Sequence, residues 1–339
     1  MRHALRFLAV LVLLSPALGA TAQEKPFDAG LPALAQGKKY KILFITQSKG
    51  FKHGSVNRKD PAGLAPSEVS VTEISKESGL FDVECTQDAS ALTPEKLKEL
   101  DAVMFYTTGA LPISPENFTA FEEWLKSGKA MIGTHSATDT FGGFRPYFSL
   151  INGTFDGHPW GSGETVPMTN HEPGHVTAKM LGEEFSFKDE IYQYKNYDPK
   201  AVRVIYSINM AKSKTKAPYH VPVSWVRESG KGRLFYTNLG HNESTWAMPL
   251  FKQHLLTGIR WVLKLEEGPA EPNPEVQYLE QAKAFAQVAG ADKADALLAK
   301  VQAASKDVAW MASLYEKIDA HRRKKAPTKD EIIAEIEKK

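Results

Sequence analysis

Short apolar runs alternate with amphipathic stretches through the first half of the chain. The runs predict four strands, at 41–46, 81–87, 102–107 and 130–134. The stretches between them predict three helices, over 67–78, from Pro94 and from Pro115 to Gly128. Thr93 and Ser114 precede the two prolines and can cap free backbone N–H groups, and proline suits the first helical position. Strands that alternate with helices predict an α/β fold in which helices cover both sides of a parallel sheet.

The regular alternation of apolar runs and amphipathic stretches ends after residue 140. Glycine, proline, histidine and aromatic residues dominate 140–200, which is typical of long functional loops. Strands are predicted again at 202–208, 221–227 and 233–238. The glycine-containing segment between the last two indicates a β-hairpin, and a helix over 251–265 closes this half of the chain.

The two ends of the chain predict separate segments. Arg2 and Arg6 precede a short apolar run at 7–14, and Ala20 and Ala22 supply the small residues of a cleavage site before Gln23. We therefore expect a signal peptide, export to the periplasm or the medium, and no membrane span in the mature chain, since a span needs about 20 apolar residues. The expected division is 1–22 signal peptide, 23–38 N-terminal lead, 39–267 α/β domain, 268–274 linker and 275–339 helical extension.

Charge and cysteine content exclude some classes of protein. The 339 residues include 42 Lys and Arg against 40 Asp and Glu, and the excess disappears once Arg2 and Arg6 are removed. A binder of nucleic acid or anionic membranes would need a basic surplus, so neither is expected as a partner. Cys85 is the single cysteine, which rules out an intrachain disulfide and predicts a buried small residue in a strand.

Three of the ten histidines directly follow predicted strands: His53, His135 and His241. Taken singly, each could be a surface or capping residue. Ligand sites of such sheets lie beyond the carboxyl ends of the strands, so we expect the three imidazoles to converge on one cleft. Imidazole suits proton transfer near neutral pH and also binds metals, so no cofactor is certain and a divalent metal is one option.

The segment 140–200 adds further candidates. His158 and Trp160 lie in a glycine-rich loop, and the indole could stack on a sugar or pack onto the core. The paired acids Asp189 and Glu190, just before Tyr192, could orient imidazoles, bind hydroxyl groups or start a helix or turn. Asp139 lies close to His135 in the sequence and could act in a similar way. His171 and His175 are separated by Pro173 and Gly174, which favours a structural loop over a metal-ligand pair. The chain lacks a phosphate-binding glycine loop after its first strand and a Gly-x-Ser-x-Gly elbow, which argues against nucleotide binding and acyl-enzyme chemistry.

Together, five motifs resemble the ThuA-like (trehalose-utilisation) family over roughly residues 39–266: Gly50–His53, Gly133–Ala137, Gly153–Pro159, Asp189–Tyr192 and Gly232–His241. The resemblance implies a flavodoxin-like, doubly wound sheet related to class I glutamine amidotransferases. His135 stands where those enzymes have a catalytic cysteine, which argues against glutamine hydrolysis. The family is associated with disaccharide breakdown through 3-keto sugars. By motif, its site residues would be His53, His135, His158, Glu190 and His241.

The main hypothesis is an exported enzyme that acts on a small carbohydrate, a keto-glycoside or related sugar, as an isomerase or a lyase. His135 is the candidate base, and His53 or His241 is the candidate acid or polarising group. The residues expected to bind the substrate are Asp139, Trp160, Tyr192, Tyr194 and Asn242. The alternative is a carbohydrate-binding protein without catalysis, in which Trp160, Tyr192, Tyr194 and Trp246 stack on sugars. A weaker third interpretation is a scaffold that acts through the helical extension.

Overall fold

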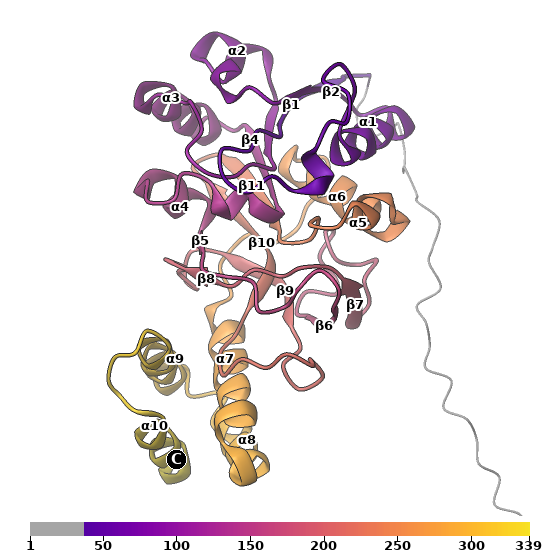
Figure 1. Ribbon diagram of the computed structural model, residues 1–339. Helices are drawn as coiled ribbons and strands as arrows, with labels where there is room; N and C mark the ends of the chain where they lie inside the picture. Colours follow the sequence, from indigo (N-terminus) through magenta and orange to yellow (C-terminus); the bar gives the residue numbers. More distant parts are fainter. Residues whose placement is uncertain (1–36) are drawn as a thin grey trace, which may run out of the picture.

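The computed structural model describes residues 37–339, so the predicted signal peptide and nearly all of the predicted lead lie outside the described residues. Figure 1 shows an α/β body with helices on both sides of one sheet and an α-helical extension below it. The predicted fold class is confirmed. Among the described residues, none of the helices has the length and apolar character needed to cross a bilayer.

One nine-stranded sheet runs through the body. Its order is β2 (Phe81–Thr86), β1 (Tyr40–Ile45), β3 (Ala102–Phe105), β4 (Ala130–Thr134), β11 (Gly232–Thr237), β10 (Pro222–Ser229), β9 (Arg203–Ile208), β6 (Thr165–Asn170) and β7 (Glu184–Lys188). The first five strands are parallel to one another, and every pair from β11 onward is antiparallel. The predicted hairpin is the β10–β11 pair. β6 and β7 arise inside the segment expected to be loop, together with a two-stranded ribbon of β5 (Thr154–Phe155) and β8 (Tyr194–Lys195).

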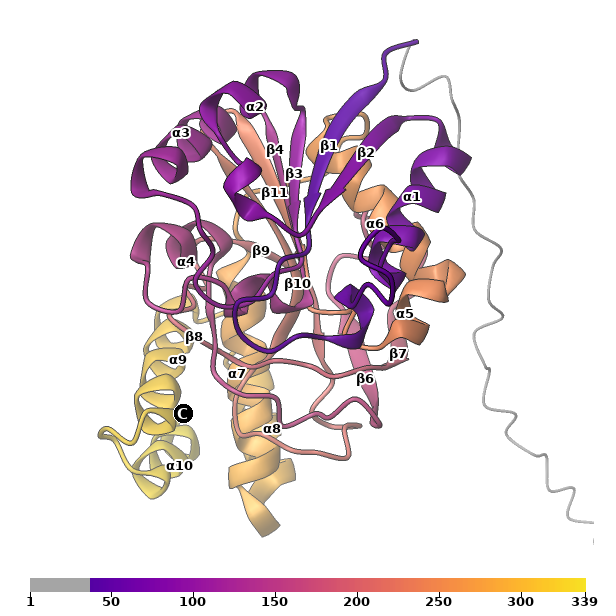
Figure 2. The same ribbon diagram turned by 45° about the horizontal axis from the view of Figure 1, so that its top comes forward.

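Helices cover the two faces of the parallel half. On one side lie α1 (Pro66–Ser78), α5 (Glu243–Ala247) and α6 (Pro249–Val262), and on the other lie α2 (Pro94–Glu99), α3 (Pro115–Lys126) and α4 (Arg145–Ile151). Figure 2 shows these two layers on either side of the strands. β1 alternates between them, because Phe44 packs in the same core as Val71 of α1 whereas Ile45 packs with Phe121 of α3.

The helical extension has its own small core but docks on the sheet domain. It consists of α7 (Pro274–Ala289), α8 (Ala294–Ala303), α9 (Val308–Arg322) and α10 (Lys329–Lys338), and its last helix begins at the expected capping box. The segment predicted as a linker is packed against the sheet. The Asn273 side chain accepts a hydrogen bond from Val204 N (2.8 Å) and donates one to Val204 O (2.9 Å). Gln277 of α7 is buried and donates to Pro199 O.

Cys85 lies in β2, so the predicted strand position is confirmed. Its side chain is partly buried, less than the full burial that was predicted. Burial raises the pKa of its thiol to about 12. The thiol is therefore protonated near neutral pH and is no nucleophile.

Candidate active site

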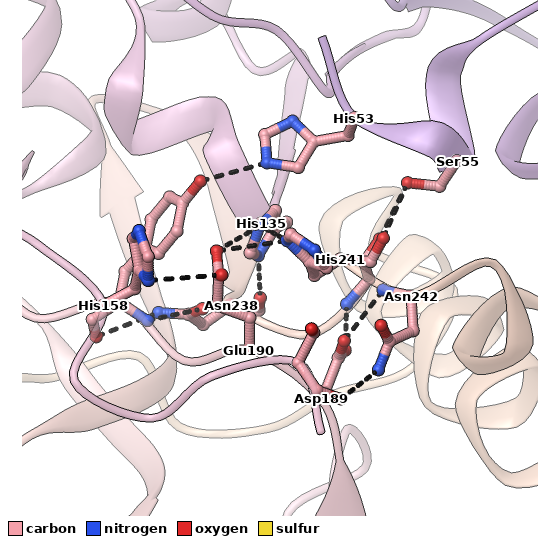
Figure 3. A network of polar contacts seen from close by, with 12 residues as sticks. His53, Ser55, His135, His158, Asp189, Glu190, Asn238, His241 and Asn242 are labelled. Carbon is pink, nitrogen blue, oxygen red and sulfur yellow. Dashed lines mark hydrogen bonds and ion pairs between the residues drawn. The ribbon is translucent and has the colours of Figure 1, made fainter. Parts of the chain in front are cut away.

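Four side chains from distant parts of the sequence meet beyond the carboxyl ends of β1, β4 and β11. His53 follows β1, His135 follows β4 directly, and His241 follows β11, while Glu190 comes from the segment after β7. One ligand atom from each lies within 4.8 Å of the others (Figure 3). The predicted convergence of the three strand-end histidines is confirmed.

The three imidazoles stand nearly perpendicular to one another. The ring centroids of His53 and His135 are 4.8 Å apart at 87°, and those of His53 and His241 are 5.1 Å apart at 90°. His135 and His241 are 5.1 Å apart at 81°. The rings therefore meet edge to face and do not stack as parallel plates.

His135 occupies a sharp turn out of the sheet. Its φ is 41°, in the left-handed region that non-glycine residues rarely adopt, and such strain gathers at functional sites. A Cβ at Gly133, just before the turn, would lie 2.9 Å from the Tyr236 ring, so the close packing there requires glycine. The His135 Nδ1 atom is 2.8 Å from the carbonyl oxygen of Asn238. Since that oxygen only accepts, Nδ1 carries the proton, and Nε2 offers its lone pair to the cluster.

The loop that carries His241 is braced from three sides. The Gly240 carbonyl accepts hydrogen bonds from Tyr106 Oη and Trp246 Nε1, both at 2.8 Å. The Asp189 carboxylate accepts from Gly240 N at 2.7 Å and from Asn242 N at 2.9 Å. Gly240 has a φ of 122°, a conformation that glycine adopts without strain. These bonds fix the position of the His241 ring next to Glu190.

Glu190 links the buried group to a more exposed histidine. Its Oε1 lies 3.1 Å from His241 Nδ1 and 3.8 Å from His135 Nε2, whereas its Oε2 lies 3.3 Å from His158 Nδ1. The side chain of His158 is 53% exposed, that of His241 is 20% exposed, and His53 and His135 are buried. A substrate arriving from solvent would therefore meet His158 before the two buried imidazoles.

Burial sets the protonation of the site. It lowers the pKa of His53 to about 3, with further lowering from His241 and His158. It also lowers the pKa of His135 well below its usual value. The carboxyl group of Asp189 has its pKa raised to about 6 by burial, against the two backbone N–H groups that favour its charged form. The two buried imidazoles are thus neutral near pH 7.

The structure does not support the predicted stacking residues. Trp160 is wholly buried, and its Nε1 donates to Ser213 Oγ and Thr215 O at 3.0 Å each. Trp246 and Tyr194 are also buried. The prediction that these rings lie against a sugar is therefore wrong, because their faces are covered by the core.

The other predicted substrate residues have mixed positions. Tyr192 does belong to the site, since its hydroxyl is 3.2 Å from His53 Nε2 and its ring centroid is 4.3 Å from that of His135. The side-chain amide nitrogen of Asn242 donates to Ser162 O and Lys188 O, both at 2.9 Å, and its role in binding substrate stays a prediction. Asp139 ends the 3-10 turn that His135 begins, and burial raises the pKa of its carboxyl group.

His171 and His175 lie outside the cluster and have structural partners, as the intervening proline and glycine indicated. His171 Nε2 is 2.8 Å from Ser207 Oγ. His175 Nδ1 is 2.8 Å from Thr177 Oγ1, and its Nε2 is 3.2 Å from Pro269 O.

Sequence reasoning did not single out Asn238 and Ser55, which brace the site, and it considered Asp189 only as one of the paired acids with Glu190. Ser55 Oγ is 2.6 Å from Tyr106 Oη and donates to His241 O at 3.1 Å, which ties the loop after β1 to the loop after β11. Asp189 and Asn238 both lie inside the quoted motifs. Their place in these motifs was the only feature of the sequence that pointed to them.

Comparison with known proteins identifies the family and agrees with the fold. The chain matches the model of the ThuA family, described as trehalose utilisation, over residues 41–262. Its fold is similar to that of a putative ThuA-like protein from Bacteroides uniformis ATCC 8492, with a TM-score of 0.55 and 21% identity over 69% of this chain and 95% of the other. A putative ThuA-like protein from Parabacteroides merdae ATCC 43184 gives a TM-score of 0.49 and 16% identity, over 70% of this chain and 98% of its own. No curated protein matches significantly. Since the family match covers more than half of the chain, the chain belongs to the ThuA family.

Proposed function

We propose that this protein converts a keto-glycoside or a related keto sugar by moving a proton on the carbon beside the ketone. The observation that carries the proposal is the convergence of three imidazoles and one carboxylate beyond the carboxyl ends of the parallel strands. The family description, trehalose utilisation, supports a carbohydrate substrate. A proton beside a ketone is acidic enough for a well-placed imidazole to remove it.

The geometry favours His158 over His135 as the base. His135 has no exposed surface, and its Nδ1 proton is held by a backbone carbonyl. His158 is half-exposed, and its Nδ1 lies 3.3 Å from Glu190 Oε2. A proton on Nδ1 would face that carboxylate. In that tautomer the Nε2 lone pair of His158 is free to take a proton, in the same way that a carboxylate orients the histidine of a hydrolase triad.

The reaction balances as an isomerisation or as an elimination. Removal of the proton from the carbon between the ketone and the anomeric centre leaves an enolate. Return of the proton at another atom of the enediol gives an isomer. Departure of the glycosidic oxygen, which takes up a proton as it leaves, gives an unsaturated keto sugar and the free second sugar. Neither route needs a redox cofactor.

The binding-protein alternative has less support, because the rings expected to stack on sugar are buried. Phe51 is the one large aromatic side chain near the group that is strongly exposed among the described residues, at 65%, and its ring centroid is 4.8 Å from that of His53. In the proposed enzyme this ring supplies an apolar wall beside the bound sugar.

The test is turnover of a panel of keto-disaccharides by the wild type and by matched variants. His158→Ala and His135→Ala should each lose activity, whereas His171→Ala, a histidine outside the group, should keep it. Unchanged turnover by both site variants on every substrate converted would contradict the assignment. Binding of the sugars without turnover would favour the alternative.

We also propose that the chain is exported, on the basis of its N-terminal sequence alone. N-terminal sequencing of the protein recovered from a bacterial host is the test. A mature chain that begins at Gln23 outside the cytoplasm supports export, and an uncleaved chain retained inside the cell contradicts it.

A further inference from the structure

We propose that His53, His135, His241 and Glu190 bind one divalent transition-metal ion. The site rests on geometry, and only the use of the ion in turning over a keto sugar rests on the proposed function. Its role there would be to hold and polarise the ketone oxygen, while His158 stays outside the ligand set.

The spacing of the atoms fits an ion. Ligands about 2.1 Å from a tetrahedral ion lie roughly 3.4 Å apart. His135 Nε2 and His241 Nδ1 are 3.3 Å apart, and Glu190 Oε1 is 3.1 Å from the second and 3.8 Å from the first. The ligand atom of His53 completes the set within 4.8 Å. Small rotations of the side chains would bring all four to bonding distance.

The neighbours of the site hold the ligands in the form that a metal requires. The Asn238 carbonyl keeps the proton of His135 on Nδ1 and leaves Nε2 free. A hydrogen bond from the ring nitrogen that does not bind the metal fixes the tautomer of a metal-bound histidine. Asp189 accepts hydrogen bonds from Gly240 N and Asn242 N, on both sides of His241. These bonds fix the backbone from which the His241 ring projects.

His53 differs from the structural histidines of the same chain. His254 has a protein partner on each nitrogen, Thr177 O at 2.7 Å and Tyr206 Oη at 3.0 Å. His53 is just as buried, yet its Nδ1 has no hydrogen-bond partner within residues 37–339. In the part of the chain that the structure describes, its Nε2 has one hydrogen-bond partner, the Tyr192 hydroxyl, which can rotate. No bond that the fold needs would be lost if this ring turned toward an ion.

The donor set selects the class of metal. Three imidazole nitrogens and one carboxylate oxygen suit zinc, iron, cobalt or nickel, whereas magnesium and calcium prefer oxygen ligands. A histidine that binds a metal ion does so as the neutral imidazole, so the ion and the Glu190 carboxylate would leave one net positive charge to attract a ketone oxygen.

The competing explanation is a hydrogen-bonded chain without metal, in which His241 Nδ1 donates to Glu190 Oε1 and His135 Nε2. The two can be separated by experiment. Untagged protein is stripped with a chelator and titrated with Zn²⁺ by calorimetry and with Co²⁺ by visible absorption.

The wild type should bind one equivalent of Zn²⁺ and give a Co²⁺ spectrum of a nitrogen-rich, low-coordinate site. His241→Ala and Glu190→Gln should weaken Zn²⁺ binding by at least about 100-fold, given that removal of a residue that only hydrogen-bonds to a ligand already costs about 10–100-fold. His158→Ala and His171→Ala should bind like the wild type. Circular dichroism shows whether each variant is folded.

A wild type that binds no Zn²⁺, or a Co²⁺ spectrum like that of the hydrated ion, overturns the site even if every variant fails to fold. So does equal binding by His241→Ala and His171→Ala. The two proposals fail separately. Metal bound without turnover of any keto sugar removes the function and leaves the site, whereas full turnover by the stripped protein shows that the reaction does not use the ion.

Discussion

Glu190 joins the largely covered His241 to the half-exposed His158, with Oε1 3.1 Å from His241 Nδ1 and Oε2 3.3 Å from His158 Nδ1. One carboxylate thus positions both the floor of the site and its solvent-facing base. Both histidines therefore depend on the same carboxylate group for their position.

Glu190→Gln should therefore reduce turnover by roughly 10²–10⁴-fold, the usual contribution of acid–base catalysis, because the amide orients His158 poorly. The measurement is kcat on the best keto-disaccharide substrate. Glu184→Gln is the matched control, since Glu184 lies on β7 and its side chain is exposed and paired with Lys212. Equal activity of the two variants would show that the carboxylate has no part in the reaction.

Trp160 should matter for stability and not for substrate binding. Trp160→Phe removes two hydrogen bonds and should lower the free energy of unfolding by about 1–3 kcal/mol while KM stays unchanged. Urea unfolding and KM are measured together. Trp124→Phe is the control, because the Trp124 Nε1 is buried without a hydrogen-bond partner among the described residues. A tenfold rise in KM for Trp160→Phe at unchanged stability would place the indole against the substrate after all.

His254 should make stability depend on pH. Burial in α6 lowers its pKa to about 4, below the ~6.5 of a free imidazole, so the unfolded chain binds the proton more readily between these values. The free energy of unfolding should fall as the pH drops from about 6.5 to 4, and His254 alone should account for a loss of roughly 2 kcal/mol by pH 5.

The check is denaturant unfolding at pH 7 and pH 5. The wild type and His321→Gln, changed in the helical extension, should lose more stability between these values than His254→Gln. Identical pH dependence in all three proteins would refute the role given to His254.

The helical extension should unfold together with the sheet domain. The buried side chain of Gln277 accepts from Tyr197 Oη at 2.7 Å and donates to Pro199 O at 2.9 Å. Gln277→Leu leaves these groups unpaired and should lower the free energy of unfolding by about 1–3 kcal/mol, whereas exposed Gln302→Leu should have little effect. Circular dichroism and tryptophan fluorescence should report one transition for the wild type. Two separate transitions would mean that the extension folds independently.

The parallel half of the fold and the floor of the site follow from local sequence. The strand predicted at 130–134 has those bounds in the structure. A compact apolar run between Gly128 and a polar turn is typical of a fully buried strand. The gathering of His53, His135 and His241 was predictable because parallel strands end at one edge of a sheet.

The antiparallel half and the burial of Trp160 could not be predicted in the same way. β6 contains Pro167 and has half-buried positions, so its run carries no clear strand pattern, and its pairing with β9 comes from residues about 40 positions away. The partners of Trp160, Ser213 and Thr215, are more than 50 residues distant and lie in a loop with no pattern of its own. The glycine-rich neighbourhood left both stacking on a sugar and packing onto the core open, and only the tertiary fold decides for the core.

The most direct test of the account uses a 3-keto-disaccharide with deuterium on the carbon between the ketone and the anomeric centre. Deuterium NMR then follows whether the label enters water as the wild-type protein converts the sugar. Proton removal by the histidine–carboxylate site predicts that the label appears in water with the wild type and does not with His158→Ala. Conversion of the sugar with the label retained on its carbon would contradict the account.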